Sequence, residues 1–209
     1  MSALRFRIRP ALALAAIGLI AALALSALDL LTRERIEKAR ADRAAASLRL
    51  VLPPDRYDNR ISQDVIELPV DGLPAAALVF RGRKNGQPSA AVIDVTTPRG
   101  YSGDIRLLIA VTPAAEVISV RVVEHRETPG LGDKIEARRS DWIEQFQGRS
   151  LGDPPRDQWA SDRRGGDFDT LTSATITSTA VIDAVARSLS SFEGAGDALW
   201  EGGPPPEAL

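Results

Sequence analysis

The sequence contains no cysteine and a single histidine, His125. The absence of cysteine excludes disulfides, thiolate-bound metals and cysteine-ligated iron–sulfur clusters. One histidine cannot build a multi-histidine metal site, so we expect no metal centre. If this protein carries electrons, the carrier must therefore be organic.

The chain also lacks an excess of charge of either sign and lacks a dinucleotide-binding motif. It has 26 Lys and Arg against 28 Asp and Glu, a net charge of -2. The two signs are interleaved, so nucleic acid is not an expected partner. No Gly-x-Gly-x-x-Gly follows a predicted strand, which argues against a dinucleotide fold. A length of 209 residues with 44% hydrophobic content allows one ordinary domain with an appendage.

The appendage is an apolar run at residues 11–31, interrupted by Ser26 and Asp29. Its length is about the 20 residues that cross a bilayer core as a helix. We expect an uncleaved transmembrane anchor preceded by a short segment at residues 1–10. A cleavable signal peptide is the alternative, because residues 22–26 contain small-residue cleavage patterns. Arginines lie on both sides of the run, so the positive-inside rule does not orient it.

The remaining chain predicts an α+β domain at residues 63–194, joined to the anchor by a juxtamembrane helix and linker at residues 32–62. Segments rich in Val and Ile predict strands, and the short connections favour antiparallel hairpins over βαβ units. The expected strands lie at residues 65–70, 76–81, 90–96, 105–111 and 117–124.

Between and after these strands the sequence predicts loops and helices. A loop is expected at residues 82–88 and a helix at residues 133–146, with Trp142 on its apolar face. A second helix is expected from about Ser178, and residues 195–209 are expected to form a flexible tail. The predicted architecture is a mainly antiparallel sheet with flanking helices.

A hydroxyl-rich stretch precedes this second helix, with five hydroxyl side chains in the seven residues 172–178. Hydroxyl residues before a helix commonly cap its free N–H groups. A helix N-terminus also favours anions such as phosphate. The stretch is therefore either a cap within a solvated loop or a phosphate-binding segment.

A second motif, residues 127–132, combines Pro-Gly with a further glycine, Gly132. Pro-Gly marks a turn, and glycine lets the backbone approach a flat ligand closely. This motif is therefore either a tight turn between elements or part of a ligand site.

Together these features resemble the G subunit of the Rnf (also called Rsx) electron transport complex. They resemble more distantly the C subunit of the sodium-pumping NADH:quinone reductase, and the two share an FMN-binding domain. Behind the anchor, the likeness is in residues 100–103, 125–134, Trp142, Phe146 and 169–178, in that order.

In that family, FMN is esterified through its phosphate to the last threonine of Asp-x-x-Ser/Thr-Gly-Ala-Thr. The resemblance implies that Thr175 is the attachment site and that Thr128 and Leu131 lie nearest the flavin ring. Ser173 stands where the family usually has glycine, and a positive φ there would strain serine. The implied cofactor-binding residues are Thr175, Asp169, Thr172, Ser173, Ala174, Thr177, Ser178, Glu127, Thr128, Gly130, Leu131 and Gly132.

The resemblance also implies partners, location and function. Other Rnf subunits pass electrons between ferredoxin and NAD(H) with coupled ion transport, and this chain relays electrons without being catalytic alone. A threonine hydroxyl needs activation, and no base lies near Thr175 in the sequence. This fits attachment by a flavin transferase that uses FAD and a divalent metal. The N-terminus would be cytoplasmic and the FMN domain periplasmic, on the bacterial inner membrane.

Two alternatives from other classes stay open at this point. The first is an exported ligand-binding module of the same fold, in which the hydroxyl stretch is only a helix cap. The second is a free-standing flavin reductase, which the missing nucleotide-binding fingerprint argues against.

Overall fold

The computed structural model describes residues 17–19 and 46–202. Apart from residues 17–19, the predicted anchor lies outside the described residues, as does most of the predicted juxtamembrane helix. Within the described ranges, no helix has both the length and the apolar character needed to span a bilayer. The chain divides into two units, Met1–Ala44 and Ala45–Leu209. The fold described below is that of the second unit.

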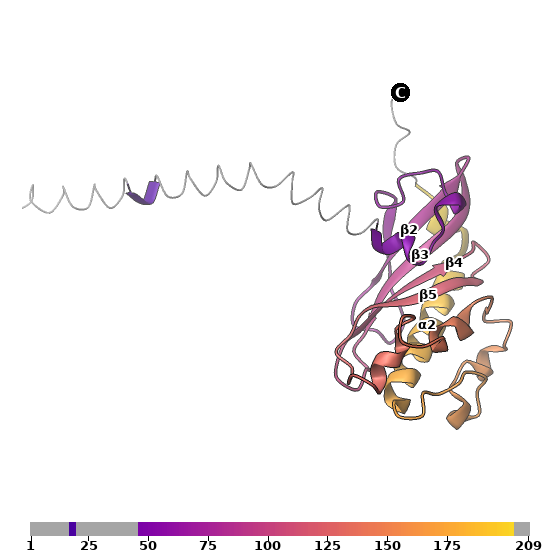
Figure 1. Cartoon of the computed structure of the whole chain (residues 1–209). Helices are drawn as coiled ribbons and strands as arrows, with labels where there is room; N and C mark the ends of the chain where they lie inside the picture. Colours follow the sequence, from indigo (N-terminus) through magenta and orange to yellow (C-terminus); the bar gives the residue numbers. More distant parts are fainter. Residues whose placement is uncertain (1–16, 20–45, 203–209) are drawn as a thin grey trace, which may run out of the picture. The chain divides into compact units, whose positions relative to one another are not determined.

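The second unit is built on a five-stranded antiparallel sheet (Figure 1). Each strand pairs with the next one in the sequence, which confirms the predicted antiparallel hairpins and the α+β class. The strands are β1 (Val65–Leu68), β2 (Ala77–Lys84), β3 (Gln87–Thr97), β4 (Ile105–Val111) and β5 (Val117–Glu124).

The predicted loop at residues 82–88 is wrong. β2 continues to Lys84 and β3 begins at Gln87, so the connection is Asn85-Gly86 alone. These two residues have φ values of 52° and 76°. Positive φ at both central positions is what a two-residue type I′ hairpin requires, and Asn-Gly is its preferred sequence. The Asn-Gly pair therefore determines this turn despite the polar residues around it.

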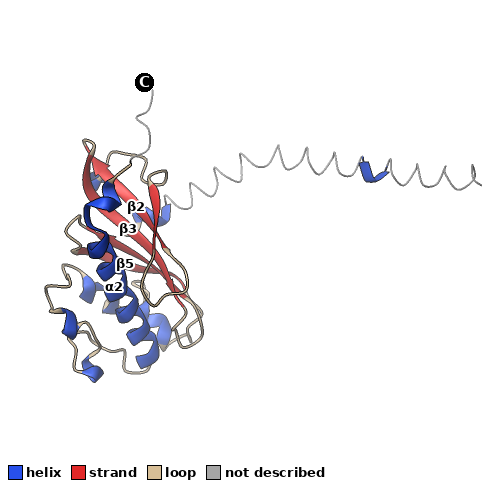
Figure 2. Cartoon of the chain, turned by 180° about the vertical axis from the view of Figure 1, so that it is seen from behind, coloured by secondary structure: helices blue, strands red, loops and turns tan. Residues whose placement is uncertain are grey.

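Both faces of the sheet are covered. α2 (Thr175–Ala195) lies along one face (Figure 2), in the same core cluster as Ile93. Leu52 and Ile61 belong to a second cluster that includes Val92. Since successive strand residues point to opposite faces, Ile93 and Val92 belong to different layers. Residues 46–62, which were expected to form the end of the juxtamembrane helix and the linker, thus pack as part of the folded domain.

The single helix predicted at residues 133–146 is also wrong. The segment forms two short 3-10 helices, η2 (Gly132–Ile135) and η3 (Trp142–Phe146). Between them, the Ser140 hydroxyl donates to the Lys134 carbonyl and accepts from the Trp142 N–H. A serine that bonds to local backbone competes with helical hydrogen bonds. The apolar residues of η3, including Trp142 and Phe146, are nevertheless buried as predicted.

The flexible tail predicted after the helix is wrong for its first residues. η6 (Gly196–Trp200) follows α2, and its Leu199 side chain is buried. The buried Arg81 guanidinium on β2 donates hydrogen bonds to the carbonyls of Leu199, Glu201 and Gly202. These contacts hold the end of the described chain against β2.

Candidate functional site

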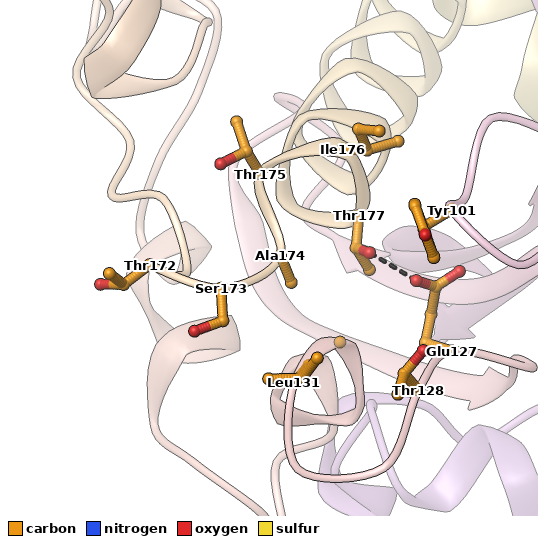
Figure 3. A pocket seen from close by; sticks show the side chains of 11 residues that line it. Tyr101, Glu127, Thr128, Leu131, Thr172, Ser173, Ala174, Thr175, Ile176 and Thr177 are labelled. Carbon is orange, nitrogen blue, oxygen red and sulfur yellow. Dashed lines mark hydrogen bonds between the residues drawn. The ribbon is translucent and has the colours of Figure 1, made fainter.

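A cavity of about 580 Å³ lies where the hydroxyl stretch, the 127–132 turn and the loop that carries Tyr101 meet (Figure 3). Small-molecule sites typically have volumes of about 300 to 1,000 Å³. The lining residues are Tyr101, Glu127, Thr128, Leu131, Gly132, Thr172, Ser173, Ala174, Thr175, Ile176 and Thr177. The two sequence motifs therefore form the walls of one cavity.

Three residues implied by the resemblance do not line this cavity. Gly130 is exposed and has φ of 80°, so it makes the turn. The buried Ser178 hydroxyl donates to the Ala174 carbonyl and accepts from the Leu171 N–H, so it shapes the loop before α2. Among the described residues, Asp169 is held through its main chain: its N–H donates to the Gln145 side-chain oxygen, and its carbonyl accepts from the Trp142 indole N–H. These residues support the site from outside the cavity.

Sequence reasoning missed two lining residues, Tyr101 and Ile176. Tyr101 is 68% exposed and Ile176 is 55% exposed, and Leu131 across the cavity is 43% exposed. Such large apolar side chains are rarely left exposed together without a ligand or partner. The available signals were an aromatic residue in a glycine-containing loop and an isoleucine within the hydroxyl stretch. Their arrangement fits a flat, largely apolar ligand.

The hydroxyl groups of residues 172–178 differ in their bonding. Within the described part of the chain, those of Thr172, Ser173 and Thr175 have no hydrogen-bond partner. The Thr177 hydroxyl donates to the Glu127 carboxylate and Thr177 is buried, while Ser178 is bonded to the loop. The hydroxyls available for chemistry are therefore those of Thr172, Ser173 and Thr175.

The helix begins three residues earlier than predicted, at Thr175, and the hydroxyl-cap hypothesis is wrong. Its N-cap is Ala174, and no side chain caps it. The first helical bond runs from the Ser178 N–H to the Ala174 carbonyl at 2.9 Å. The N–H groups of Thr175, Ile176 and Thr177 are thus left without partners in the helix. Together with the positive end of the helix dipole, they suit an anion at the cavity.

Ser173 stands at the motif position where the family usually has glycine. In the part of the chain that the structure describes, the non-glycine residues with positive φ are Asn85 and Ala115. Ser173 therefore adopts backbone angles that any residue can adopt. Its departure from glycine introduces no left-handed conformation into the motif.

Glu127 links three segments of the cavity wall. Its carboxylate Oε1 accepts from the Ser102 N–H at 3.0 Å, and Oε2 accepts from the Thr177 hydroxyl at 2.5 Å. The loop before β4, the turn after β5 and the first turn of α2 are therefore joined through one side chain. The residue is only 5% exposed, so these bonds lie inside the wall.

His125 fixes the chain that leads into Glu127. Its Nδ1 accepts from the Glu127 N–H at 3.0 Å, so Nε2 carries the proton and donates to Glu136 Oε1 at 2.7 Å. The hydrogen bond from Arg138, assisted by His125, lowers the pKa of Glu136 to about 2. Among the described residues, no cluster of three or more acidic or histidine side chains could hold a metal ion. The two hydrogen bonds of His125 orient the chain that leads into Glu127.

Comparison with known proteins places this fold and site in a class. Residues 100–190, which contain both motifs, match the FMN-binding domain family. Residues 100–190 thus form an FMN-binding domain. Among solved structures, Shewanella oneidensis NqrC aligns over 71% of this chain and 74% of its own, at 22% identity and a TM-score of 0.49.

Curated relatives identify the family more closely. The G subunit of the ion-translocating oxidoreductase complex from Salmonella typhimurium is 47% identical over 139 residues, 66% of this chain and 67% of that protein. The corresponding G subunit from Pseudomonas aeruginosa is 38% identical over 192 residues, 90% of each chain. This chain belongs to the family of G subunits of the ion-translocating oxidoreductase complex. The finding confirms the resemblance inferred from the sequence motifs.

Proposed function

We propose that this chain is the membrane-bound, FMN-carrying subunit of an Rnf-type ion-translocating oxidoreductase complex, and that it relays electrons between other subunits. Family membership supports the complex and its membrane location, and the match at residues 100–190 supports FMN. The observation that carries the proposal is the cavity itself. It combines the Thr175 hydroxyl, the unpaired N–H groups that open α2 and three exposed apolar side chains.

Thr175 is the proposed attachment site for the FMN phosphate. Its hydroxyl has no partner among the described residues, whereas the hydroxyls of Thr177 and Ser178 are engaged. Thr175 is also the first residue of α2. A phosphate esterified to it would lie beside the N–H groups of Ile176 and Thr177, where a helix N-terminus stabilises negative charge. Thr172 and Ser173 precede the helix and lack this environment.

Attachment is a transfer of FMN from FAD. The Thr175 oxygen forms a bond to the phosphorus of the FMN half, the diphosphate P–O bond breaks, AMP leaves, and the hydroxyl proton passes to a base. Within the described part of the chain, no side chain bonds to the Thr175 hydroxyl and could serve as that base. A separate flavin transferase with a divalent metal supplies the activation.

Once bound, FMN supplies the electron chemistry, and the chain supplies binding and orientation. Tyr101, Leu131 and Ile176 offer apolar surface to the ring, and the start of α2 holds the phosphate. We place the FMN domain on the periplasmic side of the inner membrane, behind a single N-terminal anchor at residues 11–31.

Co-expression of the full chain with a flavin transferase separates this proposal from its rivals. After denaturing electrophoresis, the proposal expects a fluorescent flavin band at the position of the protein. An exported binding module would give no such band. The purified chain should also fail to oxidise NADH by itself, whereas a free-standing flavin reductase would turn over.

A further inference from the structure

We propose that Glu127 sets the reduction potential of the bound FMN, and that Thr177 holds its carboxylate in place. In this inference, which rests on the proposed function, Glu127 is a positioning residue that keeps a fixed negative charge in the wall of the flavin cavity. The charge makes FMN harder to reduce than it would be in a neutral cavity.

The groups that face the Glu127 carboxyl are placed as hydrogen-bond donors. Both carboxylate oxygens accept, Oε1 from the Ser102 N–H and Oε2 from the Thr177 hydroxyl. The Ser102 N–H can only donate, and the Thr177 hydroxyl is oriented as a second donor, so both partners stabilise the carboxylate. Since each oxygen already faces a donor, the site is arranged for a carboxylate.

The backbone around Glu127 leaves room for this side chain and little else. A Cβ added at Gly100 would lie 2.7 Å from Glu127 Oε1. A Cβ added at Gly132 would lie 2.8 Å from Glu127 Cβ and 2.9 Å from Oε2. All three distances are too short for a real Cβ. Glycine at two positions from different loops therefore accommodates the carboxylate.

The charge of Glu127 is not cancelled by a cation. The structure shows ion pairs for other buried carboxylates, such as Asp64 with Arg81, but among the described residues Glu127 has no Lys, Arg or His partner. An uncompensated buried charge is costly to a fold. Its two hydrogen bonds and the nearby start of α2 offset part of that cost. A net negative charge still borders the cavity.

Electrostatics gives the direction of the effect. Two-electron reduction of FMN takes two electrons from a donor and one or two protons from solvent. With one proton, the reduced ring gains a negative charge. A fixed carboxylate nearby raises the free energy of that state, and more so away from bulk water. Removing the charge should therefore favour reduced FMN.

The test compares Glu127→Gln, Thr177→Val and Thr177→Ser with wild type, each as the full chain carrying FMN. The midpoint potential is measured by dithionite titration against a reference dye. Glu127→Gln should raise the ratio of reduced to oxidised FMN at a given potential about tenfold, or about 30 mV for a two-electron couple. Thr177→Val, which keeps the shape but frees the carboxylate, should give a smaller rise. Thr177→Ser should match wild type.

A purely structural role would lower the melting temperature of Glu127→Gln without moving the potential. A ratio within about twofold of wild type in the FMN-loaded Glu127→Gln protein therefore overturns the inference. If that variant does not fold, a Thr177→Val potential equal to that of Thr177→Ser overturns it instead. A wild-type chain without FMN contradicts the proposed function itself, so the two failures can be told apart.

Discussion

The Thr177 hydroxyl donates a hydrogen bond to the buried carboxylate of Glu127, a residue 50 positions earlier in the chain. This bond joins the first turn of α2 to the turn after β5. Two motifs that are separate in the sequence thereby become adjoining walls of one cavity. The same bond occupies the Thr177 hydroxyl, so that residue is a part of the wall and not an attachment site.

A side chain at position 132 should destabilise the fold. Gly132→Ala places a Cβ 2.8 Å from the Cβ of Glu127, and the packed wall must shift to accept it. Overpacking of this kind typically costs about 1 to 3 kcal/mol. Chemical unfolding followed by tryptophan fluorescence measures the loss, and FMN loading by the transferase should fall with it.

The matched control for Gly132 is Gly194→Ala. Gly194 lies in α2, and an added Cβ there meets nothing within 4 Å. Alanine should stabilise the helix by roughly 0.5 to 1 kcal/mol relative to glycine. Equal effects of the two substitutions would show that Gly132 is not constrained by Glu127.

Arg81 should contribute strongly to stability. Arg81→Ala leaves Asp64, which is 1% exposed, with Arg83 as its remaining cationic partner. It also removes the donors to the carbonyls of Leu199 and Glu201. Removing one partner of a buried pair costs about 3 to 5 kcal/mol when the other charge is left uncompensated. Because Arg83 stays beside Asp64, we expect a loss at the lower end of that range.

The exposed ion pair between Arg99 and Asp183 is the control for that experiment. Arg99→Ala should change the free energy of unfolding by about 1 kcal/mol or less, because solvent screens such pairs. Urea unfolding of both variants provides the comparison. An Arg81→Ala loss as small as that of Arg99→Ala would contradict this account of the contacts that Arg81 makes with Asp64 and the end of the described chain.

Glu136 should make stability depend on pH in the acid range. Arg138 and His125 lower its pKa from 4.5 to about 2, so the folded protein favours the ionised form. The stabilisation is therefore fully present above about pH 4.5 and is lost as pH falls towards 2. Wild type should be more stable than Glu136→Gln at pH 7, and the difference should shrink steadily below pH 4.5. Urea unfolding at several pH values checks this, and a constant difference would contradict it.

Tyr101 should affect the fluorescence of the bound flavin and contribute little to the stability of the fold. Its side chain is 68% exposed, so Tyr101→Ala should change the free energy of unfolding by no more than about 0.5 kcal/mol. In the FMN-loaded protein, losing this aromatic neighbour should increase flavin fluorescence. Leu78→Ala, at an exposed apolar residue of β2 outside the cavity lining, should leave the fluorescence unchanged. Equal fluorescence in the two variants would place Tyr101 away from the ring.

The strands were predictable because their Val and Ile content and short connections are local signals. Prediction from local sequence patterns failed where contacts between distant parts of the chain determine the structure. Leu52 and Ile61 are sparse apolar points in a polar segment, and only the face of the sheet opposite α2 gives them a partner. The interruption between η2 and η3 was not predicted. The apolar residues on either side fit one continuous helix, and the sequence does not show that the Ser140 hydroxyl bonds to the backbone.

The cavity residues were identified in the sequence through the motif resemblance, and their geometry was not. Apart from the motif resemblance, nothing in the hydroxyl stretch distinguishes Thr177 from Thr175 until Glu127 is placed opposite Thr177. Tyr101 was quoted within a motif but not assigned to the site, because a tyrosine in a turn has no ligand signature of its own. Its exposure at the cavity becomes visible only in the folded chain.

The most direct test of the central claim is the intact mass of the denatured full chain after co-expression with a flavin transferase. Wild type, Thr172→Ala and Thr175→Ala are measured side by side. The account predicts a gain equal to FMN less one water in wild type and Thr172→Ala, and no gain in Thr175→Ala. A gain that persists in Thr175→Ala, or no gain in wild type, would contradict the assignment of Thr175 as the site of covalent FMN.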